Sequence, residues 1–326
     1  MTNQENKKKI NLAIYWGAAC GGCCVSVLDV HEKLFVVTEY ADLVFWPIAL
    51  DIKYKDVEEM PDGFIDVTLF NGAIRNSENE HLAHLLRKKS RILVAYGSCS
   101  HLGGIPGLAN FHSKEEIFQR VYYESESTIN EDRVRPLQEC VVNEGTLKLP
   151  EFYNDVRSLN QVVDVDYYLP GCPPQTERLV EVFLAIVTGA ELPPKGSVVG
   201  AYSKSQCDEC KRKRTDNKVI KKFKRPVDVI DDGETCFLEQ GIICMGPATR
   251  GGCGARCIEG NAPCRGCYGP PPDVIDPGAK MLSAIATMID ADKEDEIDAI
   301  IESIDDTAGT FYRFSLPGSI LRRKLI

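Results

Sequence analysis

The stretch that decides the fold is residues 10–24, INLAIYWGAACGGCC. Its first seven residues are almost all apolar and are typical of a strand buried in a parallel sheet. The run breaks at Gly17, and Cys20, Cys23 and Cys24 follow. The glycines among these cysteines allow a tight turn and a close approach of the backbone to a bound group. We therefore predict a buried strand that ends in a cysteine-bearing loop.

The first half of the chain continues as an alternation of strands and helices. Apolar runs typical of buried strands are found at residues 41–47, 66–72, 91–97 and 165–169. Helical spacing of apolar residues follows at residues 78–89 and 176–188. Such alternation predicts an α/β domain with a parallel sheet. The polar, irregular residues 122–160 are predicted to be an insertion.

Two further cysteines follow predicted strands directly. Cys99 comes after the strand at 91–97, and Cys172 comes after the strand at 165–169. The carboxyl ends of parallel strands lie along one edge of a sheet, where ligands bind. We therefore expect Cys20, Cys23, Cys99 and Cys172 to converge there, and four thiolates can hold a 4Fe-4S cluster. A single cysteine at a strand end is usually a small buried apolar residue, so this expectation depends on all of them together.

The second half is rich in cysteine and poor in periodicity. Between residues 200 and 280 there are eight cysteines, at positions 207, 210, 236, 244, 253, 257, 264 and 267. This number suits two four-cysteine clusters, whose ligation stabilises an irregular chain that has a small apolar core. The Cys-x-x-Cys pairs at 207/210 and 264/267 equally suit two structural zinc ions. A zinc-stabilised binding protein therefore stays an alternative.

Composition narrows the class of protein. The chain has 326 residues, 14 cysteines and a formal net charge of −10, which argues against binding to nucleic acid. No apolar run approaches the ~18 residues of a membrane span, and no secretion signal opens the chain. We expect a cytoplasmic protein, in whose reducing surroundings thiols bind metal rather than form disulfides. The basic run 211–214 is either a solvated face or a docking patch for an acidic electron-transfer partner.

In this order, over about residues 10–280, these motifs resemble the small, electron-transferring subunit of nickel–iron hydrogenases. The likeness includes Gly171-Cys172-Pro-Pro, the segment 236–244 and the run Pro263-Cys264-Arg-Gly-Cys267. The resemblance implies a flavodoxin-like domain at 8–195 and a smaller, mostly irregular iron–sulfur domain at 196–280. An acidic helix and tail at 281–326 would complete the chain.

The resemblance also implies three 4Fe-4S clusters. Many members have a histidine where this chain has Cys207, and a proline where it has Cys257, so an all-cysteine set is expected here. The implied proximal ligands are Cys20, Cys23, Cys99 and Cys172. The implied medial ligands are Cys253, Cys257, Cys264 and Cys267. The implied distal ligands are Cys207, Cys210, Cys236 and Cys244.

By the same resemblance, dihydrogen is split at a nickel–iron centre on a separate large subunit, and no catalytic residue lies on this chain. Electrons would leave through a small 2Fe-2S delta subunit to heterodisulfide reductase, in methanogenesis. The alternative within this fold is a quinone-reductase module of a complex I type assembly, which uses adjacent cysteines such as Cys23 and Cys24. Cys24, Cys140 and His101 receive no assigned role, although His101 could donate a hydrogen bond to a cluster.

Overall fold

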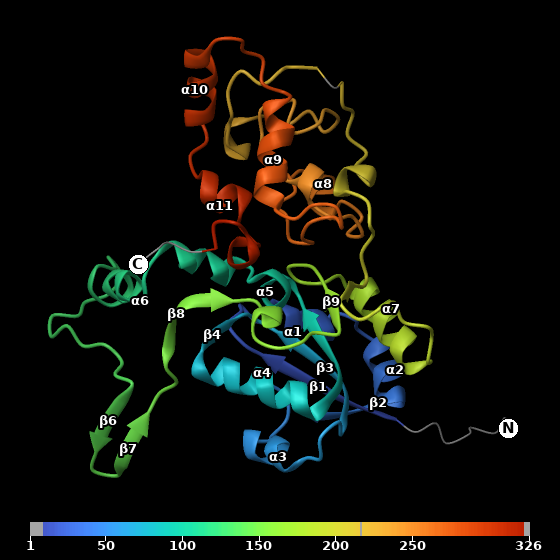
Figure 1. The fold of residues 1–326 in the computed structure, drawn as a ribbon, viewed down its shortest axis with the longest axis vertical. Helices are drawn as coiled ribbons and strands as arrows, with labels where there is room; N and C mark the ends of the chain where they lie inside the picture. The colour runs from blue at the N-terminus through green and yellow to red at the C-terminus, as the bar shows by residue number, and fades with distance from the viewer. Residues whose placement is uncertain (1–8, 216, 323–326) are drawn as a thin grey trace.

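The computed structural model describes residues 9–215 and 217–322. Six parallel strands form one sheet in the order β10-β9-β5-β3-β1-β2 (Figure 1). They are β1 (Ile10–Trp16), β2 (Ala41–Phe45), β3 (Ile65–Asn71), β5 (Ser90–Tyr96), β9 (Tyr167–Leu169) and β10 (Ser197–Val198). The predicted α/β fold with a parallel sheet is confirmed. From β2 to β9 the strands follow the flavodoxin-like order, with β10 added at the edge.

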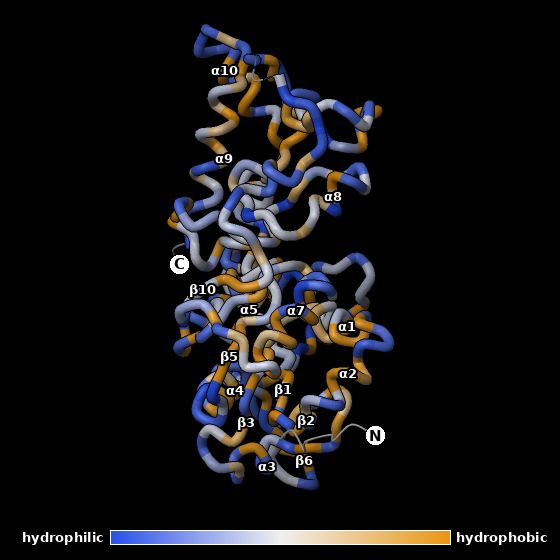
Figure 2. Tube along the Cα trace, turned by 90° about the vertical axis from the view of Figure 1, so that its right-hand side faces the viewer, coloured by the Kyte–Doolittle hydropathy of each residue, from blue (hydrophilic) through white to orange (hydrophobic). Residues whose placement is uncertain are grey.

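Helices cover both faces of this sheet, as the alternation of side chains along β1 requires. Leu12 and Ile14 belong to one core, and Ala13 and Tyr15 to the other. The first core contains side chains of α1 (Gly22–Leu28), α2 (Lys33–Tyr40) and α7 (Thr176–Val187). The second contains side chains of α3 (Tyr54–Glu59) and α4 (Ser77–Lys89). Figure 2 shows hydrophobic residues along β1 and β5, inside these layers.

The predicted insertion is more regular than its composition suggested. Strands β6 (Glu139–Val142) and β7 (Gly145–Lys148) form an antiparallel hairpin that projects from the body (Figure 1). Strand β8 (Phe152–Arg157) pairs antiparallel with β4 (Ile74–Asn76). Arg157 and Tyr153 both bind the carboxylate of Glu80 on α4, which anchors this strand to the sheet domain. Only part of the segment is therefore a loop.

The second half has short elements around its own core. They are α8 (Arg256–Glu259), α9 (Pro277–Ala286), α10 (Glu294–Glu302) and α11 (Thr307–Phe311), with the one-turn segments η4 (Gln206–Asp208) and η6 (Gly246–Ala248). Phe237 and Ile242 share this core with Met281, Ile300 and Leu316. The acidic helix expected within residues 281–326 appears as α10, with Ile300 buried. The last helices thus pack on the cysteine-rich segment rather than standing apart from it.

Hydrogen bonds join the two halves at the carboxyl edge of the sheet. Ser98, in α5 (Ser98–Leu102), donates its hydroxyl to the carbonyls of Gly171 and Cys267, at 2.8 and 2.5 Å. Gln175 donates to the carbonyl of Cys253 at 3.1 Å. These contacts place cysteines of the second half directly above the strand ends. Within the described ranges, none of the helices has the length and hydropathy to cross a membrane.

The remaining elements are short and lie on the connections. They are η1 (Ile105–Phe111), α6 (Lys114–Phe118), η2 (Gln119–Tyr123), η3 (Leu159–Gln161), η5 (Pro226–Asp228) and η7 (Leu316–Gly318).

Candidate metal centres

The first four predicted ligands meet at the sheet edge. Cys20 follows β1, Cys23 lies in α1, Cys99 lies in α5 and Cys172 follows β9. Burial raises the pKa of the Cys23 thiol, and the nearby thiols of Cys99, Cys172 and Cys20 raise it further. Burial, followed by the thiols of Cys172 and Cys20, raises the pKa of Cys99 to about 12. The structure therefore brings these four thiols into one group.

Glycines leave the space that this group of thiols occupies. A Cβ added at Gly97 would lie 2.4 Å from Sγ of Cys23, and one at Gly104 would lie 2.6 Å from Sγ of Cys99. Both glycines have positive φ, at +87° and +58°. The backbone N–H of Gly22 donates to Sγ of Cys20 at 3.4 Å. Close backbone approach and amide donation to sulfur are what a cluster site requires.

A second group of thiols lies in the other half. Burial raises the pKa of Cys207 to about 12, and the thiols of Cys244, Cys236 and Cys210 contribute further. A Cβ at Gly246 would lie 2.9 Å from Sγ of Cys207, so this loop also needs a glycine. The four predicted distal ligands are thus near one another.

The third group lies between the other two. Cys253, Cys257, Cys264 and Cys267 all line one cavity of about 190 Å³. Cys172 of the first group lines the same cavity. On the far side, the N–H of Cys264 donates to Sγ of Cys244 at 3.3 Å. The middle group therefore adjoins the first group through Cys172 and the second group through Cys244.

The residues fit iron–sulfur clusters on three counts: the thiols are grouped in fours, glycines make room at their sulfur atoms, and polar side chains lie unpaired beside the middle group. Tyr268 and Gln206 line the middle cavity, and their polar ends have no hydrogen-bond partner. Over residues 9–215 and 217–322, no three or more His, Cys, Asp or Glu side chains are arranged to hold a single metal ion.

Comparison with known proteins decides the family. A profile of the family described as "NADH ubiquinone oxidoreductase, 20 Kd subunit" matches residues 20–186. The iron–sulfur G subunit of the F420-non-reducing hydrogenase of Archaeoglobus profundus is 43% identical, over 97% of this chain and 99% of the relative. The chain belongs to the family of F420-non-reducing hydrogenase G subunits. The recognition of a nickel–iron hydrogenase small-subunit relative, similar to these G subunits, is thereby confirmed.

Other relatives of the G-subunit family agree. The G subunit of the F420-non-reducing hydrogenase of Methanothermobacter marburgensis is 38% identical, over 98% of each chain. A chain of the Ni-Fe-Se hydrogenase from Desulfomicrobium baculatum shares the fold, with a TM-score of 0.50 and 20% identity, over 82% of this chain and 96% of that one. The G-subunit chain is therefore a hydrogenase subunit with an electron-transfer role, and the catalytic centre of the enzyme lies on another subunit.

Three residues that the sequence left without a role are placed clearly. The thiol of Cys24 is buried and accepts a hydrogen bond from Nδ2 of Asn71 at 3.1 Å. Cys140 is exposed on the projecting hairpin. The ring of His101 packs on Tyr168 at 4.7 Å, and burial, followed by the charge of Arg250, lowers its pKa to about 3. His101 is thus a neutral, buried side chain.

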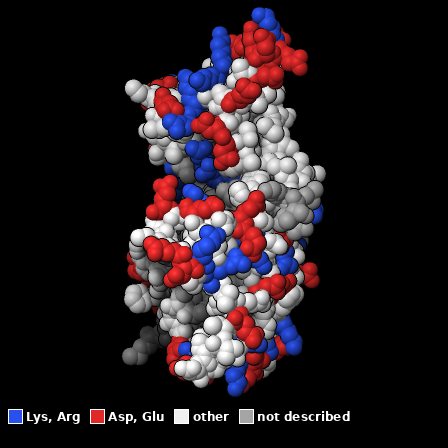
Figure 3. Space-filling view, turned by 90° about the vertical axis from the view of Figure 1, so that its left-hand side faces the viewer, with Lys and Arg blue, Asp and Glu red and all other residues white. Residues whose placement is uncertain are grey.

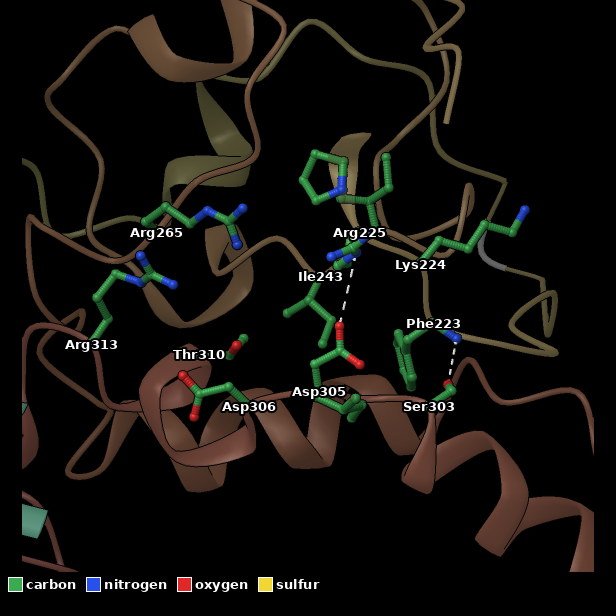
Figure 4. Close-up of a pocket in the computed structure, with 13 residues that line it drawn as sticks. Phe223, Lys224, Arg225, Ile243, Arg265, Ser303, Asp305, Asp306, Thr310 and Arg313 are labelled. Atoms are coloured by element: carbon green, nitrogen blue, oxygen red, sulfur yellow. Dashed lines mark hydrogen bonds and ion pairs between the residues drawn. The ribbon is translucent and has the colours of Figure 1, made fainter. Parts of the chain in front are cut away.

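Arginines beside the middle and distal thiols were not foreseen from the sequence. Arg265 and Arg313 line a cavity of about 280 Å³, and Figure 4 shows their guanidinium groups next to one another on one side of it. Burial lowers the pKa of Arg265, as does the charge of Arg313, whereas the thiols of Cys244 and Cys264 raise it. Arg265 lies between two predicted medial ligands in the sequence, and that position was the available clue.

The basic run is largely neutralised by carboxylates of the same chain. Lys211 pairs with Glu259, Arg212 with Asp231 and Lys213 with Glu234. On the face shown in Figure 3, positive and negative side chains are interspersed. This pairing weakens the long-range field that a docking patch for an acidic partner would need.

Proposed function

We propose that the chain binds three 4Fe-4S clusters and passes electrons between a nickel–iron centre on a separate large subunit and an iron–sulfur or flavin partner. The observation that carries this is the grouping of the thiols in three sets of four, with the middle set adjoining both others. Each such cluster, when bound, exchanges single electrons at a potential set by its protein surroundings. The ligands are the three sets named from the sequence: Cys20, Cys23, Cys99 and Cys172; then Cys253, Cys257, Cys264 and Cys267; then Cys207, Cys210, Cys236 and Cys244.

The residues of the chain have two tasks in this function. The thiols must lose their protons when they bind metal, which couples cluster binding to proton release and to folding. The surrounding side chains hold the groups at fixed spacing, since Cys172 borders both the first and the middle group. The exposed Cys20 and Cys172 leave the first group accessible at the surface, where the large subunit would cover it.

The partners belong to the same proposal. The electron acceptor would be a small 2Fe-2S delta subunit that delivers electrons to heterodisulfide reductase, in the cytoplasm of a methanogenic cell. The quinone-reductase alternative has one observation in its favour, because the matched family profile carries that name. That profile ends at residue 186, before all eight cysteines of the second half, whereas the G-subunit relatives extend over them.

The decisive experiment measures iron, zinc and acid-labile sulfide per chain after anaerobic purification. Three cubane clusters require about 12 iron and about 12 sulfide per chain. About four iron with zinc in the remainder would leave only the first site and overturn the proposal. Co-purification with a nickel-containing subunit separates the hydrogenase from the quinone-reductase alternative.

A further inference from the structure

Two polar side chains are buried against the middle cavity without partners. Tyr268 is 2% exposed and Gln206 is 1% exposed. Neither Oη of Tyr268 nor either amide atom of Gln206 has a hydrogen-bond partner. Leaving such a group unpaired costs about 1–3 kcal/mol, so a missing partner is expected.

The walls of the cavity limit what that partner can be. Besides the cysteines, the lining contains Ala255, Ile258 and Phe314, which offer no acceptor side chain. The proton of the Thr249 hydroxyl is already used, because it is donated to the carbonyl of Met245 at 2.6 Å. The side-chain acceptors in this cavity are therefore the hydroxyl oxygen of Thr249 and the sulfur atoms of the lining cysteines and of whatever they hold; these cysteines are Cys172, Cys253, Cys257, Cys264 and Cys267.

We propose that Tyr268 and Gln206 donate hydrogen bonds to sulfur atoms of the group held at the middle site and raise its reduction potential. This inference rests on the proposed function. Thiolate and sulfide sulfur can only accept, so Tyr268 donates through Oη and Gln206 through Nε2. The reduced form carries one more negative charge, so donated hydrogen bonds stabilise it more than the oxidised form.

The two donors lie where the middle group meets its neighbours. Tyr268 follows Cys267, whose thiol is close to that of Cys172 in the first group. Gln206 precedes Cys207, and a Cβ at Gly246 would lie 2.9 Å both from its Oε1 and from Sγ of Cys207. One donor therefore lies toward the first group and the other toward the distal group. Both are positioning residues that act through the bound group.

The backbone holds both residues in place. The N–H of Gln206 donates to the carbonyl of Thr249 at 2.7 Å, and the N–H of Arg250 donates to the carbonyl of Gly269 at 2.8 Å. The loop at residues 249–250 is thus bonded both to the segment that carries Gln206 and to the segment that carries Tyr268. Exchanging the side chains should therefore remove the donors and leave the loop intact.

The experiment uses the complete hydrogenase complex, purified anaerobically, with Tyr268→Phe, Gln206→Leu and the double substitution. Redox titration followed by electron paramagnetic resonance should show a lower potential for the middle site. At a fixed potential, the ratio of reduced to oxidised middle sites should fall about tenfold for each donor lost. Proton ENDOR in H₂O and D₂O should show that exchangeable couplings of this site disappear.

Tyr167→Phe is the matched control, because its hydroxyl donates to the carbonyl of Pro193, at 3.1 Å, and not to sulfur. It should leave the potential unchanged. Unchanged potentials and retained exchangeable couplings in the double variant, at full iron content, would overturn the inference and leave the proposed function standing. Zinc in the unmodified chain, or fewer than about 12 iron per chain, would overturn both the inference and the proposed function.

Discussion

At the scale of single residues, the first site depends on glycine as much as on cysteine. Gly97 has a φ of +87°, and a Cβ there would lie 2.4 Å from Sγ of Cys23. No rotation of an alanine methyl relieves such an overlap. The backbone strain that alanine would suffer is a separate, smaller cost of about 1–3 kcal/mol.

We predict that Gly97→Ala removes the cluster at the first site and lowers iron by about four per chain. The matched control is Gly189→Ala, because Gly189 also has positive φ, at +70°, but its added Cβ would contact nothing within 4 Å. The control should lose some stability and keep its iron. Iron analysis and thermal unfolding distinguish the two effects, and full iron in Gly97→Ala would show that the loop can shift.

We predict that Cys24→Ala leaves the first site occupied. Its thiol is engaged by Asn71, on the carboxyl end of β3, whereas Cys23 faces the other three thiols. The iron content and the resonance signal of the first site should match those of the unmodified chain, while Cys23→Ala loses both. Loss of the signal in Cys24→Ala would favour the adjacent-cysteine arrangement of the quinone-reductase alternative.

The positions of Cys20, Cys99 and Cys172 after predicted strands were enough to predict the first group of thiols, because strand ends in a parallel sheet share an edge. It could not predict the roles of Tyr268 and Gln206. Both look like ordinary neighbours of cysteines in the sequence, and only the packing shows that their polar ends are unpaired. Cys24 illustrates the same limit, since its neighbour Asn71 is 47 residues away.

At the scale of elements, one ion pair organises the loops of the second half. Arg212 is 4% exposed at its side chain, binds both oxygens of Asp231 at 2.6 Å and stacks on Phe237 at 3.8 Å. It also donates to the carbonyl of Thr235. A residue that looked like part of a surface patch therefore holds two loops together beside the distal thiols.

We predict that Arg212→Ala destabilises the chain by about 3 kcal/mol, because Asp231 would be left without its partner in a nearly buried site. Lys213→Ala is the matched control from the same run, since Lys213 and Glu234 are both exposed and such pairs contribute about 0–1 kcal/mol. Urea unfolding of the anaerobic protein measures both. Equal losses in the two variants would contradict the structural role of Arg212.

The same pair predicts an acid limit on stability. Hydrogen bonds from Arg212 hold the pKa of Asp231 well below its usual value of 3.8. Because the pKa of Asp231 is lower in the folded chain than in the unfolded chain, the unfolded chain takes up this proton at a higher pH. The stabilisation is therefore present above about pH 4 and is lost as the pH falls below it. Asp231→Asn should flatten this part of the stability curve, measured by urea unfolding across the acid range. A curve as steep as that of the unmodified chain would place the acid sensitivity elsewhere.

Long, apolar elements were predictable and short, polar ones were not. The strand predicted at 91–97 is β5 (Ser90–Tyr96), and the helix predicted at 176–188 is α7 (Thr176–Val187). Strand β8 was missed because its residues alternate little and its stability comes from ion pairing with α4 and pairing with β4. In the second half, elements as short as α8 form around the thiols and carry no periodicity of their own.

At the scale of the whole molecule, the middle site should tolerate the loss of one ligand. Cys257 is the exposed member of its set. We predict that Cys257→Ala gives a three-iron cluster there, with about 11 iron and 12 sulfide per chain. An electron paramagnetic resonance signal of an oxidised three-iron cluster checks this. Cys264→Ala, at the buried ligand of the set, should lose the whole middle cluster, and equal iron contents in the two variants would contradict the difference.

The order of the three sites along the molecule is a property of the assembled chain. The sequence separates Cys172 from Cys267 by the whole start of the second half, yet both line one cavity. The positions of the predicted strands assigned the first set, and the resemblance to a family assigned the other two, but the contacts between the sets could not be calculated from the sequence. The resemblance to a family supplied that order, which stays a prediction.

The loop that carries Cys172 borders both the first and the middle groups of thiols, and this fixes their separation. Ser98 ties the carbonyl of Gly171, in that loop, to the carbonyl of Cys267. The electron-tunnelling distance between the first and middle groups of thiols is therefore set by a few residues that hydrogen bonds hold together, and not by how the two halves are oriented.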